Sequence, residues 1–179
     1  IDLTKKKLIL TTVHRRENWG NKLIEIINGI KKVLQVHEDA YFLLPVHPNQ
    51  KIREPFNKLL GNHPRFIICE PLDYDSFVGA IKASTILLTD SGGLQEEAPS
   101  LGKPVLVLRD STERPEGIAE GTSKLVGTNP SKIFSEIDLL LTDDNAYKQM
   151  AQARNPFGDG MASKRILDIC RQYLRSDFE

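Results

Sequence analysis

The stretch TILLTDSGGL, residues 85–94, decides the fold of this 179-residue chain. Its first half is a short apolar run, which is typical of a strand that is buried on both faces. Its second half passes through two glycines into a segment with helical spacing. A buried strand that leads directly into a helix is the first part of a crossover between parallel strands. We therefore expect an α/β fold in which this unit is repeated.

Apolar runs of similar length are spaced along the whole chain, and segments with helical periodicity lie between them. The predicted strands are Leu8–Val13, Tyr41–Val46, Phe66–Cys69, Thr85–Thr89, Val105–Leu108 and, more weakly, Lys124–Val126. Helical spacing of apolar residues is found within 23–34, 56–60, 77–81, 133–141 and 162–174. This alternation predicts right-handed crossovers and a doubly wound, mostly parallel sheet. In such sheets, ligands bind at the carboxyl ends of the strands.

The composition excludes several classes of protein. The 24 basic and 24 acidic side chains give a formal net charge of zero, which argues against a nucleic-acid partner bound by a broad basic surface. No window approaches the ~20 apolar residues that a membrane span requires, so we expect no membrane partner. Cys69 and Cys170 are far apart, so we expect a reducing, cytoplasmic environment and neither a disulfide framework nor a metal site.

Polar segments follow the predicted strands at the edge where ligands bind. His14 and Arg15 follow the first strand, and His47 follows the second. A histidine at a strand end can bind an anion or transfer a proton. This position favours a function for His14, whereas a turn-capping role explains His47 equally well. Arg114 follows the fifth strand and can contact a diphosphate, although a surface loop of salt bridges explains it too.

Ser91, Gly92 and Gly93 begin the helix that follows the fourth strand. Two glycines let a ligand approach the backbone closely, and the unpaired N–H groups of a helix start attract anions. Glu97 lies about one and a half turns further on, where a carboxylate can bind the hydroxyls of a ribose. The alternative is a plain strand-to-helix turn that Ser91 caps. The phosphate-loop, dinucleotide and hydrolase glycine motifs are absent from the sequence.

Taken together, these segments resemble the C-terminal half of the non-hydrolysing UDP-N-acetylglucosamine 2-epimerases. The resemblance runs from about Leu8 to Leu174. It is carried by TVHRREN (12–18), HPN (47–49), EPLDY (70–74), TDSGGLQEEAPSLGKPVL (89–106), RDSTERPE (109–116) and NPFGDG (155–160). It implies a Rossmann-like half of a B-type glycosyltransferase fold, in which two such domains face each other across a cleft and the second holds UDP.

The resemblance also implies roles for particular residues. Glu97 would bind the ribose, Phe77 would lie near uracil, and Leu72 would contact uracil through its backbone. His14 would have a catalytic role as well as touching the nucleotide. The full substrate-binding set is His14, Leu72, Phe77, Ser91, Gly92, Gly93, Glu97 and Arg114. Some bacterial members bind a second UDP-sugar as an activator, and positions matching His14, Arg15 and His47 are implicated there.

The implied reaction interconverts UDP-N-acetylglucosamine and UDP-N-acetylmannosamine by elimination and re-addition of UDP through 2-acetamidoglucal. No cofactor is implied. In the family, the carboxylates that transfer protons come from the first domain, so this chain alone is expected to bind UDP without turnover. Two alternatives keep the nucleotide site: the donor-binding domain of a UDP-sugar glycosyltransferase and a non-catalytic UDP-sugar-binding module. A hydrolysing epimerase is a closer variant.

The domain organisation follows from the same features. Residues 1–7 contain three lysines before the first strand and are predicted to be a linker from a missing N-terminal domain. Residues 8–143 are the predicted nucleotide-binding domain. Residues 144–179 are predicted to form a helical annex that packs back toward the missing domain. The expected partners are UDP and UDP-N-acetylhexosamine, with a homodimer formed through the missing domain.

Overall fold

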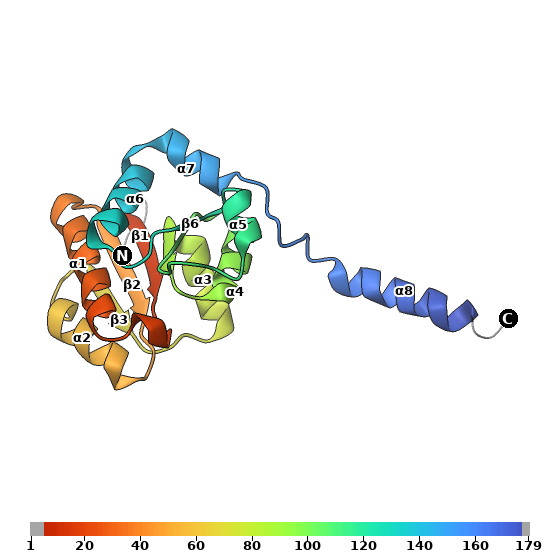
Figure 1. Ribbon diagram of the computed structural model, residues 1–179, viewed down its shortest axis with the longest axis horizontal. Coiled ribbons are helices and arrows are strands. Elements are labelled where there is room, and N and C mark those ends of the chain that lie inside the picture. Colours follow the sequence, from red (N-terminus) through yellow and green to blue (C-terminus); the bar gives the residue numbers. More distant parts are fainter. Residues whose placement is uncertain (1–5, 177–179) are drawn as a thin grey trace.

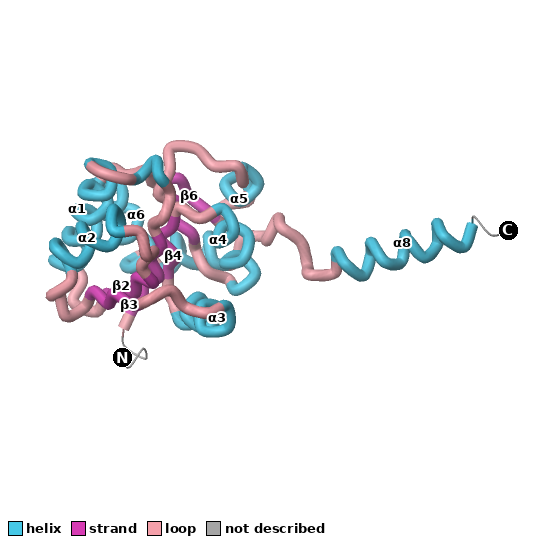
Figure 2. Tube along the Cα trace, turned by 90° about the horizontal axis from the view of Figure 1, so that it is seen from below, coloured by secondary structure: helices cyan, strands magenta, loops and turns pink. Residues whose placement is uncertain are grey.

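A parallel sheet of six strands in the order β3-β2-β1-β4-β5-β6 forms the centre of the structure, a computed structural model that describes residues 6–176 (Figures 1 and 2). Each pair of neighbouring strands is parallel. This is the strand order of the Rossmann fold. From β1, the chain adds β2 and β3 on one side and then β4, β5 and β6 on the other, so the switch point lies between β1 and β4. The strands are β1 (Lys7–Thr12), β2 (Ala40–Pro45), β3 (Phe66–Cys69), β4 (Ile86–Thr89), β5 (Val105–Val107) and β6 (Ser123–Leu125).

Helices follow the strands as the sequence pattern predicts. Their starts have recognisable caps: the side chains of Asn49, Asp73 and Asn129 each accept a hydrogen bond from a backbone N–H in the first helical turn. The α-helices are α1 (Asn21–Val36), α2 (Gln50–Leu60), α3 (Tyr74–Ala83), α4 (Gly92–Glu97), α5 (Pro115–Ala119), α6 (Pro130–Thr142), α7 (Asp144–Ala151) and α8 (Ala162–Ser176). The short 3-10 helices are η2 (Arg16–Asn18) and η3 (Ala98–Leu101).

The two faces of the sheet bury two hydrophobic clusters. Ile9 of β1 packs in the cluster that α1, α2 and α6 cover, whereas the next residue, Leu10, packs in the cluster that α3, α4 and η3 cover (Figure 1). Burial of each Leu or Ile side chain stabilises the fold by roughly 1.5–3 kcal/mol relative to leaving it exposed. Because both faces are covered, the strands are apolar along their length rather than alternating, as the sequence pattern indicated.

A close contact between α1 and α6 fixes one of these layers. A Cβ atom added to Gly29 would lie 2.9 Å from the Cβ atom of Ile133, closer than real side chains approach. Gly29 therefore lets the two helices pack more tightly than any other residue would allow. This contact holds α1 against α6, and α1 begins directly after the β1 loop.

The C-terminal segments differ in how they pack. The helix α7 contacts α6, whereas α8 projects from the rest of the structure and exposes several apolar side chains (Figures 1 and 2). These are Ile166, Leu167, Ile169, Tyr173 and Leu174. The predicted boundary at residue 143 and the predicted role of this annex stay predictions. Most of the predicted linker, residues 1–5, lies outside the described residues, and Lys7 already begins β1.

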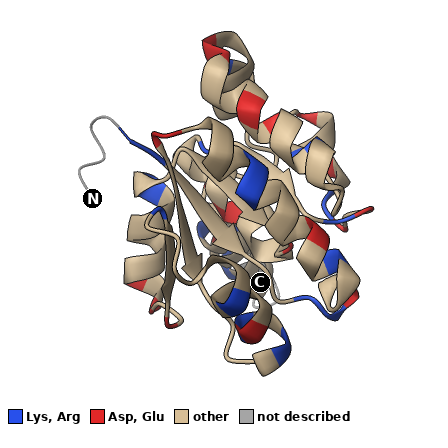
Figure 3. Cartoon of the chain, turned by 90° about the vertical axis from the view of Figure 1, so that its left-hand side faces the viewer, with Lys and Arg blue, Asp and Glu red and all other residues tan. Residues whose placement is uncertain are grey.

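Charges of both signs are interspersed on the face of the molecule drawn in Figure 3, where Lys and Arg lie among Asp and Glu. Within residues 6–176, no helix combines the length and the apolar character that crossing a bilayer requires.

Candidate functional site

The site lies where the strand order reverses. Thr12 and Thr89 end the neighbouring strands β1 and β4, they are paired in the sheet, and their hydroxyl oxygens are 2.6 Å apart. Beyond them the chain turns to opposite faces of the sheet, toward α1 after β1 and toward α4 after β4. Divergence of this kind opens a crevice at the carboxyl edge of a doubly wound sheet. The fold therefore brings the β1 loop and the start of α4 to one place.

A buried carboxylate, Asp90, organises this place. Its side chain is fully buried and accepts hydrogen bonds from the backbone N–H groups of His14 and Arg15 and from the Nδ2 atom of Asn18. Its Oδ1 atom also lies 2.9 Å from His14 Nδ1. Burial raises the pKa of Asp90, but the hydrogen bonds from His14, Arg15 and Asn18 outweigh it, and the net pKa is lowered. Asp90 stands between the buried strand and the Ser-Gly-Gly segment, yet no sequence pattern predicted a role for it.

The start of α4 is open. Ser91 stands at the N-cap position, but its side chain makes no capping hydrogen bond, so the alternative of a turn capped by Ser91 is not what the structure contains. A Cβ atom on Gly92 would come no closer than 3.6 Å to Arg15 Nη2, and one on Gly93 no closer than 3.9 Å to Ser91 Oγ. Space is therefore open beside Gly92 and Gly93, with the Arg15 guanidinium next to it, whereas the backbone N–H of Ser91 donates to Thr89 Oγ1 over 2.9 Å.

Two adjoining hollows lie on this edge of the sheet. One, of about 260 Å³, is lined by Thr12, His14, Tyr74, Phe77, Ser91, Gly93, Leu94 and Glu97. The other, of about 250 Å³, is lined by Thr12, Val13, His14, Pro45, Val46, His47, Pro48, Pro71, Leu72 and Phe77. They share Thr12, His14 and Phe77, so they form neighbouring parts of one concave region. The first has a polar end at Ser91, and the second has mostly apolar walls.

Most of the residues singled out in the sequence meet in this region. His14, Phe77, Ser91, Gly93 and Glu97 line the first hollow, and Leu72 and His47 line the second. The rings of His14 and His47 are stacked with their centroids 6.5 Å apart. Asp73 caps the start of α3, and Phe77, in the first turn of that helix, lines both hollows.

Gly92, Arg15 and Arg114 line neither hollow. Gly92 and Arg15 lie next to each other at the start of α4, whereas the Arg114 guanidinium Nε donates a hydrogen bond to Glu96 on α4. The hydrogen bond with Glu96, the largest cause, raises the pKa of Arg114. The alternative interpretation of this loop, as a set of salt bridges, therefore describes the arrangement of Arg114 in this structure.

A chain of ion pairs connects the β1 loop with the loop after β5. Arg109 is 8% exposed and its guanidinium donates to Glu17, over 2.7 Å, and to Glu113. Glu113 also accepts from Arg15, whose Nε donates to the backbone oxygen of Asp90 over 2.9 Å. The hydrogen bond from Arg109 is the main cause that lowers the pKa of Glu113 to about 2. The network holds Arg15 next to the open start of α4.

Gln95 is a second buried polar residue for which no sequence pattern predicted a role. Its Nε2 atom donates to the backbone oxygen of Ser91 over 3.0 Å, and its Oε1 atom accepts from the hydroxyl of Thr112. Thr112 in turn accepts a hydrogen bond from the backbone N–H of Arg114. One sequence signal was available. Gln95 and Ala98 are three residues apart, which places them on the same side of a helix, and an apolar residue at 98 indicates that this side is buried.

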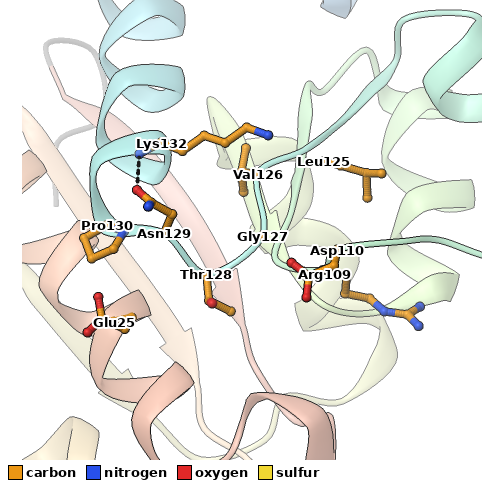
Figure 4. Close-up of a pocket in the computed structure, with 10 residues that line it drawn as sticks. All are labelled: Glu25, Arg109, Asp110, Leu125, Val126, Gly127, Thr128, Asn129, Pro130 and Lys132. Carbon is orange, nitrogen blue, oxygen red and sulfur yellow. Dashed lines mark hydrogen bonds between the residues drawn. The ribbon is translucent and has the colours of Figure 1, made fainter.

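A third hollow, of about 480 Å³, lies between α1, the start of α6 and the loops after β5 and β6 (Figure 4). Glu25, Arg109, Asp110, Asn129 and Lys132 are among its lining residues, and none of the residues predicted for the site lines it. The Arg109 guanidinium points away from Glu25 and Asn129 in Figure 4, in keeping with its pairing to Glu17 and Glu113. Within residues 6–176, no three His, Cys, Asp or Glu side chains are grouped to hold a metal ion.

The doubly wound sheet, the open helix start and the concave region at the switch point define a Rossmann-like ligand-binding domain. A family model described as UDP-N-acetylglucosamine 2-epimerase matches residues 1–171, and the chain belongs to this family.

Relatives agree with this assignment. The UDP-N-acetylglucosamine 2-epimerase of Escherichia coli K12 is 48% identical over 166 residues, which is 93% of this chain and 44% of that protein. The S. aureus MnaA–UDP co-structure has a TM-score of 0.92 and 46% identity and covers 97% of this chain and 47% of its own. The Neisseria meningitidis UDP-GlcNAc 2-epimerase bound to UDP-GlcNAc has a TM-score of 0.89 and 44% identity, with 93% and 45% covered.

This chain thus spans less than half the length of the curated relatives it matches. The fold alone is shared with the C-terminal domain of the glycosyl transferase group 1 protein LpcC from Francisella tularensis, at a TM-score of 0.65 and 16% identity, with 86% of this chain and 83% of that chain covered. The predicted fold class, one Rossmann-like half of a B-type glycosyltransferase fold, is confirmed.

Proposed function

We propose that this chain is the UDP-binding half of an enzyme that interconverts UDP-N-acetylglucosamine and UDP-N-acetylmannosamine. The observation that carries the proposal is the meeting of His14, Phe77, Ser91, Gly93 and Glu97 around one hollow at the switch point of the sheet. Relatives that are close in sequence and structure have been solved with UDP and with UDP-GlcNAc, which supports a nucleotide-sugar ligand here.

The hollow suggests an orientation for UDP. The diphosphate would lie beside the Ser91 hydroxyl, which makes no capping hydrogen bond, and the backbone of Gly92 and Gly93, where helix-start N–H groups and the nearby Arg15 guanidinium favour an anion. Glu97, at the other end of α4, would accept hydrogen bonds from the ribose hydroxyls. Uracil would lie between Phe77 and the backbone at Leu72, in the more apolar of the two hollows.

Arg114 has to move to reach the diphosphate in this arrangement. Its pairing with Glu96 is partly exposed, with 37% of the Arg114 side chain accessible, so exchanging this partner for a phosphate loses little. A phosphate offers the guanidinium a doubly hydrogen-bonded contact with more charge than a carboxylate. We therefore propose that Arg114 leaves Glu96 when UDP binds.

In the proposed reaction, a base removes the proton from C2 of the sugar while the C1–O bond breaks and its electron pair leaves with UDP. The product, 2-acetamidoglucal, adds UDP again with protonation on the other face of C2. The N–H groups near Ser91, with Arg114 and His14, would stabilise the charge that develops on the leaving diphosphate. The carboxylates that transfer the C2 proton come, by resemblance, from the first domain of the family, so we propose that this chain alone does not turn over.

The remaining expectations are proposals of the same kind. His14, Arg15 and His47 would contact a second UDP-sugar that acts as an activator, and the stacked rings of His14 and His47 stand at the rim where it would enter. The exposed apolar side chains of α8 would pack against the first domain of the family. That domain would also form the homodimer interface, and the protein would act in the cytoplasm.

Titration of this chain with UDP, followed by calorimetry, tests the binding half of the proposal. We expect UDP to bind and ADP to bind much more weakly, because the space near Phe77 would accept uracil. Absence of measurable UDP binding would contradict the proposal. Product analysis after incubation of the full-length protein with UDP-N-acetylglucosamine tests the reaction: UDP-N-acetylmannosamine supports it, whereas free N-acetylmannosamine indicates a hydrolysing enzyme.

Two other functions keep the same site. A glycosyltransferase would move the sugar to an added acceptor, and the likeness to LpcC concerns the fold alone. A non-catalytic UDP-sugar-binding module would bind UDP without any product from the full-length protein. The same product analysis, repeated with acceptor sugars present, separates these functions from the epimerase.

A further inference from the structure

His14 and Asp90 form a hydrogen-bonded pair at the centre of the candidate site. The Nδ1 atom of His14 lies 2.9 Å from Oδ1 of Asp90. The Asp90 side chain is 0% exposed, whereas the His14 side chain is 42% exposed. The edge of the ring that carries Nδ1 therefore faces the protein interior. The opposite edge, which carries Nε2, is left for the hollows that His14 lines.

The other contacts of Asp90 determine which nitrogen of His14 carries the proton. The Oδ2 atom accepts three hydrogen bonds, from the backbone N–H groups of His14 (3.0 Å) and Arg15 (2.9 Å) and from Asn18 Nδ2 (2.9 Å). Burial raises the pKa of Asp90, but these contacts and that of His14 Nδ1 more than offset it and favour the ionised form. An ionised carboxylate only accepts hydrogen bonds, so Nδ1 of His14 is the donor.

We propose that Asp90 is a positioning residue: it holds His14 with a proton on Nδ1 and presents Nε2 to the ligand. The inference rests on the proposed function, in which the ligand at Nε2 is the diphosphate of UDP. A neutral His14 held in this way offers an acceptor at Nε2. A protonated His14 donates from Nε2 to a phosphate oxygen while the buried carboxylate balances the positive charge of the ring.

Among the titratable groups around the His14 ring, Asp90 is the one placed to position it. The other titratable groups near His14 come from three elements: His47 stacks on it from the loop after β2, and Tyr74 of α3 and Glu97 of α4 line the hollow on its exposed side. These groups stand on the ligand side of the ring. Asp90 alone among them approaches from the interior, where it also fixes the backbone of His14.

The Asp90→Asn variant makes a sharp prediction. Asparagine has one acceptor oxygen and one NH₂ donor in place of two acceptors. The His14 N–H is shared between Oδ1 (3.1 Å) and Oδ2, but the Arg15 N–H and Asn18 Nδ2 donate to Oδ2 alone. These two donors require the oxygen at the Oδ2 position, which turns the NH₂ group toward His14 Nδ1. The ring then has to accept at Nδ1 and carry its proton on Nε2. We therefore expect Asp90→Asn to invert the tautomer of His14.

Nitrogen-15 NMR of this chain at alkaline pH measures the tautomer directly, and His14→Gln assigns the signals among the four histidines. The unsubstituted chain should show neutral His14 protonated on Nδ1, and Asp90→Asn should show it protonated on Nε2. The matched control is Asn18→Ala, which removes one contact of Asp90 without touching Nδ1 and should leave the tautomer unchanged.

A proton on Nε2 in the unsubstituted chain overturns the inference, even if Asp90→Asn does not fold. So does an unchanged tautomer in a folded Asp90→Asn variant, because Asp90 would then serve only to pack the loop. Titration with UDP is the second measurement, and we expect Asp90→Asn to lose about tenfold or more in affinity. If the unsubstituted chain does not bind UDP, the proposed function fails, while the tautomer still decides the role of Asp90.

Discussion

Gln95 Oε1 accepts a hydrogen bond from the hydroxyl of Thr112 over 2.6 Å, and this contact joins the helix after β4 to the loop after β5. The same amide donates to the backbone oxygen of Ser91, so one buried side chain fixes the Ser-Gly-Gly turn relative to the loop that carries Arg114. A buried amide with both ends satisfied is stabilising, and it becomes costly when only one side of the network remains.

Replacement of Gln95 by Leu should therefore destabilise the fold. Leucine leaves the Ser91 oxygen and the Thr112 hydroxyl, both partly buried, without this partner, and each lost hydrogen bond costs about 0.5–1.5 kcal/mol. Urea unfolding measures the loss. Gln35→Leu, at an exposed position of α1, is the control and should change stability by no more than about 0.5 kcal/mol. Equal stability of the two variants would contradict a structural role for Gln95.

Substitutions of the two neighbouring glutamates of α4 should differ in their effect on UDP binding. If Glu97 accepts hydrogen bonds from ribose, Glu97→Gln should weaken UDP binding by on the order of 1.5–3 kcal/mol, measured by calorimetry. Glu96→Gln should not weaken binding, because it releases Arg114 from its ion pair and frees it for the diphosphate. Unchanged binding in Glu97→Gln would move Glu97 out of the site. Weaker binding in Glu96→Gln would show that the ion pair with Arg114 is needed in the bound state.

Gly93→Ala should separate stability from binding. The added Cβ atom meets nothing closer than 3.9 Å, so the fold should be as stable as before or gain up to about 1 kcal/mol. The same methyl group would occupy the space where the diphosphate approaches the backbone, so UDP affinity should fall. Gly79→Ala, in α3 with nothing within 4 Å, is the matched control and should leave binding unchanged. Full UDP affinity in Gly93→Ala would argue against a diphosphate at this turn.

Acid should destabilise the fold partly through Glu113. Its hydrogen bond from Arg109 is the main cause that lowers its pKa from 4.5 to about 2. A carboxyl group whose pKa is lower in the folded than in the unfolded state contributes stability above its unfolded pKa, and this stability is lost as pH falls through the folded pKa. The urea concentration at the unfolding midpoint should therefore decrease as the pH is lowered from about 4.5 to about 2.

Glu113→Gln should reduce that slope without abolishing it, because the lowered pKa of Asp90 acts in the same direction. High salt should also reduce the Glu113 contribution, since its side chain is 51% exposed and its ion pairs are screened. Glu120→Gln, at an exposed position after α5, provides the comparison. An unchanged slope in Glu113→Gln would indicate that its pairing with Arg109 does not persist in solution.

Much of the fold and part of the site were predictable from local sequence patterns. Short apolar runs such as Ile86–Thr89 identified the strands because burial on both faces demands apolar side chains throughout. The caps at Asp73 and Asn129 are local features of the same kind, because their side chains act on N–H groups of near neighbours in the sequence. The Ser-Gly-Gly turn was recognisable for a similar reason: the openness of the helix start depends on residues adjacent in the sequence.

Contacts between distant segments were not predictable in this way. The sequence alone gave no reason to pair Asp90 with His14, which is 76 positions away, or Gln95 with Thr112 across two loops. Arg114 was expected at the ligand, but it pairs with Glu96. A partly exposed guanidinium gains a similar free energy from either anionic partner, so the sequence does not indicate which one it binds.

The order of residues by itself determined which segments became strands and helices and where an anion-attracting turn stands, because those properties depend on burial and on near neighbours in the chain. Only the tertiary structure decided that β1 and β4 lie side by side, and with them that the buried Asp90 carboxylate meets the histidine of another loop. Alternation of apolar runs is compatible with many strand orders. The partners across a sheet are selected by how all the layers pack together, and that choice belongs to the folded chain as a whole.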